Sequence, residues 1–382
     1  MSLFRRKSLA ELMPLDEGEG GLKRALTATN LILLGIGAII GAGIFVVTGT
    51  AAAQHSGPAI VLAFVLAGLG CLFAGLCYAE FAAMIPVAGS AYTYGYATLG
   101  ELVAWIIGWD LILEYLFAAS TVAVGWSGYF TAFMTDLGIK LPPALTGAPF
   151  AVEGTHTLVR SQICVDPASG ALAVDAVSRT PITLADCVTK GFSLTPGILN
   201  VPHPVFVAIE KAGPSHKWLT YFINIGAIAG LASVVLVMLM GQPRIFYSMS
   251  RDGLLPPVFG RVHPKFRTPH VSTIVTGVVA ALIAGLFPIG LLGELVSIGT
   301  LLAFVIVCGG ILVLRRKQPD LHRPFRTPWV PVVPILGILI CGYMMYGLPT
   351  DTWLRLAIWM ALGLAIYFLY GRRHSKLNSN GA

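Results

Sequence analysis

The stretch GIGAIIGAGIF, residues 35–45, decides how this chain is read. It lies in a run that carries no Asp, Glu, Lys or Arg from residue 25 to residue 79, and it contains four glycines: Gly35, Gly37, Gly41 and Gly43. Glycine costs a helix interior about 1 kcal/mol relative to alanine. Four glycines in one apolar segment therefore indicate a backbone that either opens or is closely approached.

Two interpretations of this stretch remain open from the residues alone. Gly37 and Gly41 form a GxxxG pair, which lets neighbouring membrane helices approach closely. Alternatively, Gly41, Ala42 and Gly43 leave the helical path near the middle of the bilayer and free their N–H groups. Freed donors at a helix end suit an anion such as a substrate carboxylate.

The composition places the chain among integral membrane proteins. Hydrophobic residues make up 56% of it and charged residues 11%, whereas soluble domains carry roughly 25% charged residues. The net charge of +7 is distributed in short basic clusters between apolar runs. This pattern is typical of membrane topology and excludes a nucleic-acid partner, so the expected environment is the lipid bilayer.

Windows of about 20 mostly apolar residues predict an all-α polytopic membrane protein with eight transmembrane helices. The spans are expected near residues 26–52, 59–84, 101–133, 218–240, 271–288, 291–314, 330–348 and 353–370. The chain then divides into a tail (1–25), helices one to three (26–135), a polar segment (136–216), helices four to eight (217–371) and a second tail (372–382).

The basic residues predict the orientation of these spans. They cluster in the amino-terminal tail, after the fourth span, after the sixth span and at the carboxyl terminus. All four clusters fit one cytoplasmic side, which makes both termini cytoplasmic and the segment 136–216 extracytoplasmic. Cys164 and Cys187 would share that oxidising side, where they could form a disulfide.

Two acidic residues lie deep inside the third span. Asp110 and Glu114 are four residues apart on one helical face, roughly 13 to 20 Å into the helix. Both should not be ionised together in a dry setting, so at least one is expected to be protonated or paired with a cation. They are candidate coupling or core polar groups. Glu80 and Glu101, near span ends, are expected to be exposed to water, and Glu294 to be interfacial.

Enzymatic functions find little support in the residues. GWSG, residues 125–128, has the spacing of intramembrane serine proteases, with Ser127 as a nucleophile, but no histidine lies mid-span downstream to act as its base. The chain contains no HExxH, no GxxxxGK[ST] and no Cys/His spacing for a metal. We therefore expect no enzyme, no metal and no cofactor, while a receptor or scaffold is not excluded by motif.

Several long motifs resemble those of one transporter family. They run over most of the chain and include LTATNLILLGIGAIIGAGIF (26–45), YAEFAAMIPVAGSAYTYGYATLGELVAWIIGWDLILEY (78–115), VGWSGYF (124–130), HPVFVAIEKAG (203–213), GQPRIFYSMSRDGLLPPVFGRVHPKFRTPHVSTIVTG (241–277) and RRKQPDLHRPFRTPWVPVVPILGI (315–338). The chain thereby resembles the amino acid permeases of the amino acid, polyamine and organocation superfamily, in the branch of the cationic amino acid transporters.

The resemblance implies a LeuT-type fold of two inverted five-helix repeats, with an amino acid bound between broken first and sixth helices. It implies a secondary active transporter of the plasma membrane, proton-coupled or facilitated. The N–H groups of Gly41, Ala42, Gly43 and Ile44 would hold the substrate carboxylate, and the Ile40 carbonyl would lie near the amine. It also makes GWSG an ordinary part of the third helix.

The chain departs from this family in its helix count. Relatives have twelve helices, whereas this chain passes from the third to what resembles their eighth, through a junction near GILNVP, residues 197–202. The broken sixth helix is among the four that are missing. Two functions remain open: an amino acid permease that works through an altered bundle, a homo-oligomer or a second permease chain, and a transport-incompetent or regulatory remnant.

Overall fold

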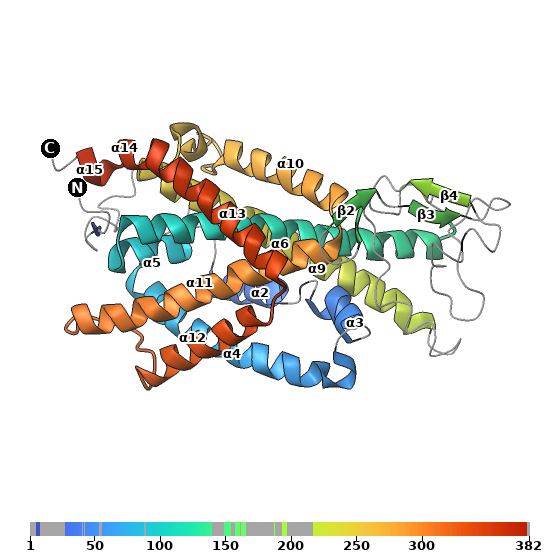
Figure 1. The fold of residues 1–382 in the computed structure, drawn as a ribbon, viewed down its shortest axis with the longest axis horizontal. Helices are drawn as coiled ribbons and strands as arrows, with labels where there is room; N and C mark the ends of the chain where they lie inside the picture. The colour runs from blue at the N-terminus through green and yellow to red at the C-terminus, as the bar shows by residue number, and fades with distance from the viewer. Residues whose placement is uncertain are drawn as a thin grey trace.

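The computed structural model of the chain describes residues 5–7, 27–39, 41, 43–52, 56–87, 89–139, 149–153, 157–160, 162–165, 187, 193–196 and 217–379. In this part of the chain the helices run side by side as an elongated bundle (Figure 1). Both chain ends lie at one end of the bundle and the short strands lie at the other (Figure 1).

The first predicted span is not one helix. It begins with α2 (Ala28–Ile39), continues as the π-helix η1 (Gly43–Val47) and ends with α3 (Thr48–Ala51). The predicted second and third spans are continuous: a 3-10 turn, η3 (Gly57–Ala59), leads into α4 (Ile60–Met84), and α6 (Glu101–Asp136) follows.

A short helix that the spans did not predict, α5 (Ser90–Thr98), lies between α4 and α6. Its nine residues, SAYTYGYAT, are too few and too polar for a span, yet every residue from Ala91 to Thr98 is buried. Gly89 precedes it with φ +119°, a conformation that favours glycine. The Tyr94 ring stacks on Phe81 of α4 with centroids 5.1 Å apart, so aromatic packing holds α5 against the bundle.

The predicted polar segment adds four short strands to an otherwise helical structure. They form two antiparallel pairs, β1 (Phe150–Glu153) with β2 (Thr157–Arg160) and β3 (Gln162–Val165) with β4 (Ser193–Pro196). Cys187 is buried and disulfide-bonded. The side chain of Cys164 lies outside the described residues, so its pairing with Cys187 stays a prediction.

Each of the five later predicted spans contains one main helix. In chain order these helices are α9 (Lys217–Arg251), α10 (His270–Leu286), α11 (Ile289–Lys317), α12 (Val332–Tyr346) and α13 (Thr350–Ile366). A 3-10 turn, η6 (Pro257–Gly260), follows α9, and α13 continues into η7 (Tyr367–Gly371), α14 (Arg372–His374) and α15 (Lys376–Ser379). Helices α4, α6, α9, α11 and α13 with its extension are long and apolar enough to cross a membrane, and α2, α10 and α12 are shorter apolar helices.

Helix α6 is the centre of the bundle. Of its most apolar stretch, 61% is buried, against at most 39% for the other four long helices. It packs on α9, α11, α10, α5 and α13. The seam with α13 is built from tryptophans: Trp109 stacks on Trp359, and each indole N–H donates to the other residue's carbonyl oxygen, at 2.8 and 3.0 Å. The carboxylates of α6 therefore lie on the most enclosed helix.

Candidate functional site

The glycine-rich stretch contains a real interruption of the first helix. The described helix α2 ends at Ile39, the π-helix η1 begins at Gly43, and Gly41 between them belongs to neither helix. Between them the Gly41 N–H donates to the Ile39 carbonyl at 2.8 Å, two residues back rather than four. Ile40 and Ala42 lie outside the described residues. The discontinuous-helix interpretation of this stretch thus has a structural basis.

The glycines around the interruption differ in what surrounds them. At Gly37 an added Cβ would lie 2.9 Å from Ser233 Oγ of α9, so this glycine allows close helix packing. At Gly41 the nearest atom would be the Ala38 carbonyl oxygen at 3.7 Å, and at Gly43 nothing lies within 4 Å. The packing interpretation therefore holds for Gly37 alone, because Gly41 and Gly43 are not pressed against another helix.

The part of the chain after the interruption is anchored on the centre of the bundle. Val46 of η1 is buried in a cluster with Val122 and Tyr129 of α6 and Leu231 of α9. Thr48 Oγ1 donates to the Gly43 carbonyl at 2.7 Å. Ile44, by contrast, is 57% exposed. Both sides of the interruption therefore contact the bundle, α2 through α9 and η1 through Val46.

Asp110 is the least satisfied carboxyl group of the described structure. Its side chain is fully buried, and neither carboxylate oxygen has a hydrogen-bond partner among the described residues. A Cβ added at Gly299 of α11 would lie 3.5 Å from Asp110 Oδ1 and 3.1 Å from Leu113 Cδ2. The α11 backbone therefore approaches α6 at this point, and an ionised, unpaired Asp110 would be very costly there.

Glu114 lies one turn further along the same face of α6. It is half-buried and lies beside Thr300 of α11. Its Cβ also lies close to the Gly299 position, at 3.6 Å from an added Cβ. The predicted pair is thus brought together at the α6–α11 contact. Val122, on which η1 packs, lies two turns beyond Glu114, so among the described residues the carboxyl pair is not in contact with the helix interruption.

The expectation that Glu80 and Glu101 face water is wrong. Glu80 is fully buried and Glu101 is 3% exposed. Both lie where the bundle meets loops and tails that cover it, which a position near a span end does not reveal. Glu294 is half-exposed, and it pairs with Arg355 at 3.0 Å and accepts from Thr352 at 2.7 Å, as befits an interfacial group.

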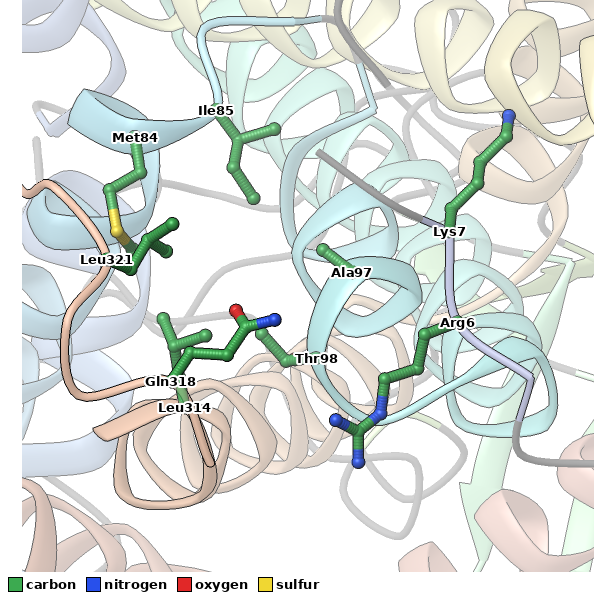
Figure 2. Close-up of a pocket in the computed structure, with 9 residues that line it drawn as sticks. All are labelled: Arg6, Lys7, Met84, Ile85, Ala97, Thr98, Leu314, Gln318 and Leu321. Carbon is green, nitrogen blue, oxygen red and sulfur yellow. The ribbon is translucent and has the colours of Figure 1, made fainter. Parts of the chain in front are cut away.

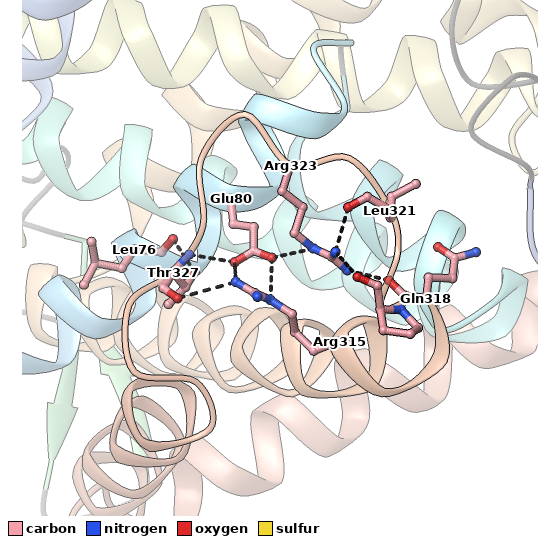
Figure 3. Close-up of polar contacts among 8 residues, drawn as sticks. Leu76, Glu80, Arg315, Gln318, Leu321, Arg323 and Thr327 are labelled. Atoms are coloured by element: carbon pink, nitrogen blue, oxygen red, sulfur yellow. Dashed lines mark hydrogen bonds and ion pairs between the residues drawn. The ribbon is translucent and has the colours of Figure 1, made fainter.

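Glu80 is held by two arginines from the other half of the chain (Figure 3). Arg315 donates to both of its oxygens, each at 2.9 Å, in a bidentate pair. Arg323 Nε lies 3.1 Å from Oε1, and its other nitrogens donate to backbone carbonyls of Gln318, Pro319 and Leu321. The Thr327 N–H completes the set at 2.8 Å. The carboxylate thus fastens the loop after α11 onto α4.

Glu101 and Asp252 join both chain tails to the same end of the bundle. Glu101 accepts hydrogen bonds from Tyr96, Tyr367 and Ser375. Asp252 accepts from Tyr92 at 2.7 Å and pairs with Lys7. Burial raises the pKa of Tyr92 and of Tyr96, so both hydroxyls stay protonated and donate. The basic residues of the two tails were identified from the sequence, but Glu101 and Asp252 were not identified as the acidic residues that the tails contact.

The Ser127 hydroxyl donates to the Val124 carbonyl at 2.7 Å, within its own helix. Backbone bonding of this kind is common for serine in membrane helices. No group of three or more His, Cys, Asp or Glu residues in the described part of the chain is arranged to hold a metal ion.

The chain is similar in sequence to known membrane transporters. The sequence profile described as amino acid permease matches residues 26–158 and 182–366. The chain is 42% identical to the branched-chain amino acid permease BcaP and 39% identical to the methylthioribose transporter, both of Bacillus subtilis (strain 168), over 99% of each chain. It is 26% identical to the mouse cationic amino acid transporter 4, over 97% of this chain and 91% of that protein.

The alignment with BcaP also bears on the helix count. It runs over 464 positions, so at least 82 of them have no residue from this 382-residue chain. At about 20 residues per span, an internal gap of this size is compatible with the loss of four helices. The chain is therefore a multi-pass membrane protein rather than an enzyme, and it belongs to the amino acid permease family.

Proposed function

We propose that this chain is an amino acid permease of the plasma membrane, and that it binds the substrate carboxylate at the interruption of its first helix. The observation that carries the proposal is the end of α2 at Ile39 and the restart of helical geometry at Gly43. Backbone N–H groups released at such an interruption suit an anion, and the Gly41 N–H would exchange its bond to the Ile39 carbonyl for one to the substrate. The printed names of the relatives, a branched-chain amino acid permease and cationic amino acid transporters, support an amino acid as the substrate.

The glycines support this assignment over simple packing. Gly41 and Gly43 have room around them, whereas Gly37 meets Ser233. A ligand that bonds to the backbone needs such room, and a bare backbone lets it approach. Ile40, Ala42 and Ile44 complete the proposed site through their backbone groups.

Asp110 and Glu114 are proposed as the coupling groups. Asp110 is compatible with its dry surroundings when its carboxyl group is neutral. Binding of the coupled proton makes it neutral. Glu114, which lies beside Thr300, would exchange protons with Asp110 along one helical face. Because the Asp110 carboxyl and the Cβ of Glu114 both lie next to Gly299 of α11, a change in protonation would alter the contact between α6 and α11.

A second chain is proposed to complete the substrate site. The main helix contact of α2 is with α9, and Leu31, Ile32, Ile36 and Ile39 of α2 are exposed in the described structure. In the complete fold the site lies between two broken helices, and the second of these is missing here. A homo-oligomer or another permease chain would cover this face.

Both termini are proposed to be cytoplasmic and the 136–216 segment extracytoplasmic. The four basic clusters share one side, and the strands lie at the end of the bundle opposite both chain ends (Figure 1). A single cysteine introduced at position 175 should react with a membrane-impermeant reagent added outside intact cells. Labelling only after cell lysis contradicts this orientation.

The test of the binding site compares Gly43→Leu with Gly35→Leu. An added Cβ meets nothing within 4 Å at either glycine, so both variants should insert and fold. Leucine at 43 should block the N–H groups and weaken binding of labelled leucine by about tenfold or more, since a hydrogen bond to a charged group contributes about 1.5–3 kcal/mol. Gly35→Leu should bind normally. Equal binding by both variants would end the carboxylate proposal.

At least 82 positions of the BcaP alignment have no residue from this chain. This difference favours a second candidate, a transport-incompetent remnant. Uptake into liposomes separates the two functions. The permease proposal expects saturable uptake once the chain is assembled as an oligomer or with another permease chain. A chain that binds leucine and never transports it, alone or assembled, is the remnant.

A further inference from the structure

A cavity lies between the amino-terminal tail and the ends of α4, α5 and α11 (Figure 2). Its volume is about 310 Å³, within the roughly 300–1,000 Å³ of ligand sites. One wall comes from the ends of α4 and α5 and the opposite wall from the end of α11 and the loop after it. The lining residues are Arg6, Lys7, Met84, Ile85, Ala97, Thr98, Leu314, Gln318 and Leu321.

The lining is apolar with a basic rim. Met84, Ile85, Leu314 and Leu321 supply hydrocarbon surface. Arg6 supplies a guanidinium, and in Figure 2 this group lies on the side of Thr98 and Gln318 while the Lys7 ammonium points away from the other lining residues. A ligand that fits this lining is amphiphilic and carries negative charge.

The charges around the cavity leave Arg6 available. Lys7 is paired with Asp252. Glu80 is taken by Arg315 and Arg323. Arg6 itself has no hydrogen bond or ion pair to the residues that the structure describes and is half-buried. An anion entering the cavity would therefore meet an uncompensated positive charge.

The cavity lies at the level of the membrane surface. It is built on the last residues of α4 and α11, two helices long and apolar enough to cross a membrane. The loop after α11 places Trp329, 82% exposed, and Phe325, 37% exposed, near the same end. Exposed aromatic side chains beside membrane helices are typical of the lipid headgroup region. The adjacent Arg316 and Lys317 are exposed and add to the positive field.

We propose that this cavity binds the headgroup of an anionic phospholipid. The lipid phosphate pairs with Arg6 and accepts from the Gln318 amide, and the glycerol and first acyl methylenes contact Met84, Leu314 and Leu321. Basic pockets between membrane helices bind anionic headgroups in this way. A free inorganic anion would leave the apolar wall uncovered, so the membrane is the source of the ligand.

Bound lipid would stabilise the amino-terminal tail against the bundle. The Lys7 N–H donates to the Tyr96 carbonyl, and the Arg5 carbonyl accepts from the Glu101 N–H. A phosphate bound to Arg6 would add a third interaction between the tail and the bundle, at the residue between Arg5 and Lys7. The site is independent of the amino acid site, since its residues take no part in the first helix or in the carboxyl pair of α6.

The test uses the purified full chain in a neutral detergent. Its thermal unfolding midpoint is followed by size-exclusion recovery after heating, with dioleoylphosphatidylglycerol, dioleoylphosphatidylcholine or soluble glycerol phosphate added. Phosphatidylglycerol should raise the midpoint above that with phosphatidylcholine, because a ligand that binds only the folded state stabilises it. Glycerol phosphate should produce no shift, and Arg6→Gln should lose at least half of the difference between the lipids.

Arg316→Gln is the matched control, since it removes the same charge from an exposed position that does not line the cavity. It should keep the full difference between the lipids. Gln318→Glu, which places a negative charge on the rim, provides a second variant should Arg6→Gln fold poorly, and it should also reduce the difference. Equal midpoints in the two lipids, equal losses in Arg6→Gln and Arg316→Gln, or a shift reproduced by glycerol phosphate would each overturn the proposal.

Discussion

Two buried carboxyl groups of this protein have opposite surroundings. Glu80, at the end of the bundle, is held by two arginines and a backbone N–H. Asp110, in the first third of α6, is equally buried and has no hydrogen-bond partner among the described residues. The first carboxylate is paired with cations and holds two segments of the chain together. The second carboxyl group has no such partner, which is compatible with the proton-coupling role proposed for it.

The largest effect should follow from removing the charge of Glu80. In Glu80→Gln, the side chain of Arg323, 1% exposed, and that of Arg315 lose their carboxylate. Breaking a buried pair in this way costs about 3–5 kcal/mol. We expect most of the folded protein to be lost, measured as monodisperse material after extraction.

Glu294→Gln is the control for that variant. It breaks an ion pair with Arg355 in which the two side chains are 36% and 27% exposed, and such pairs contribute about 0–1 kcal/mol. A Glu80→Gln protein as stable as Glu294→Gln would mean that the Glu80 cluster does not stabilise the contact between α4 and the loop after α11.

A smaller effect is expected at Glu101, whose partners are neutral hydroxyls. Tyr367→Phe removes one donor and leaves Tyr96 and Ser375 in place. A single such hydrogen bond contributes about 0.5–1.5 kcal/mol to stability. The unfolding midpoint should fall slightly, whereas a loss as severe as that of Glu80→Gln would show that Glu101 depends on Tyr367 alone.

The smallest effect on stability is expected at Asp110. Asn is nearly the same size as a neutral Asp, so Asp110→Asn should change the free energy of unfolding by about 1 kcal/mol or less. It should nevertheless abolish any proton-dependent uptake or exchange, measured with a pH-sensitive dye in liposomes. A strongly destabilised Asp110→Asn would show that the carboxyl is ionised and paired, which would remove the contrast with Glu80.

The sequence predicted the helices better than it predicted their contacts. Each apolar window contains a helix because burial in lipid demands about 20 apolar residues whatever the neighbours are. Helix α5 was not predicted, because SAYTYGYAT has no such window and is buried through contacts with α4, α6, α9 and α11. Local composition holds no information about those contacts.

The same limit explains the outcomes at the candidate sites. The glycines indicated an unusual backbone. Only the position of Ser233 distinguishes Gly37, which packs against α9, from Gly41 and Gly43, which have room around them. The surroundings of Glu80 depend on Arg315, 235 residues away. Asp110 and Glu114 were identified because their spacing and depth are local properties of one helix.

The position of Ser375 has a consequence for how the protein is made. Glu101 is buried at the start of α6, yet one of its donors comes from Ser375, and the Lys376 N–H reaches Asp252. These residues leave the ribosome after every span has been synthesised. The end of the bundle therefore cannot close during insertion, and Glu101 must stay hydrated until translation of the tail is complete. A fusion partner or truncation that delays or removes residues 375–377 should act as an assembly defect, in chains whose spans are all correctly inserted.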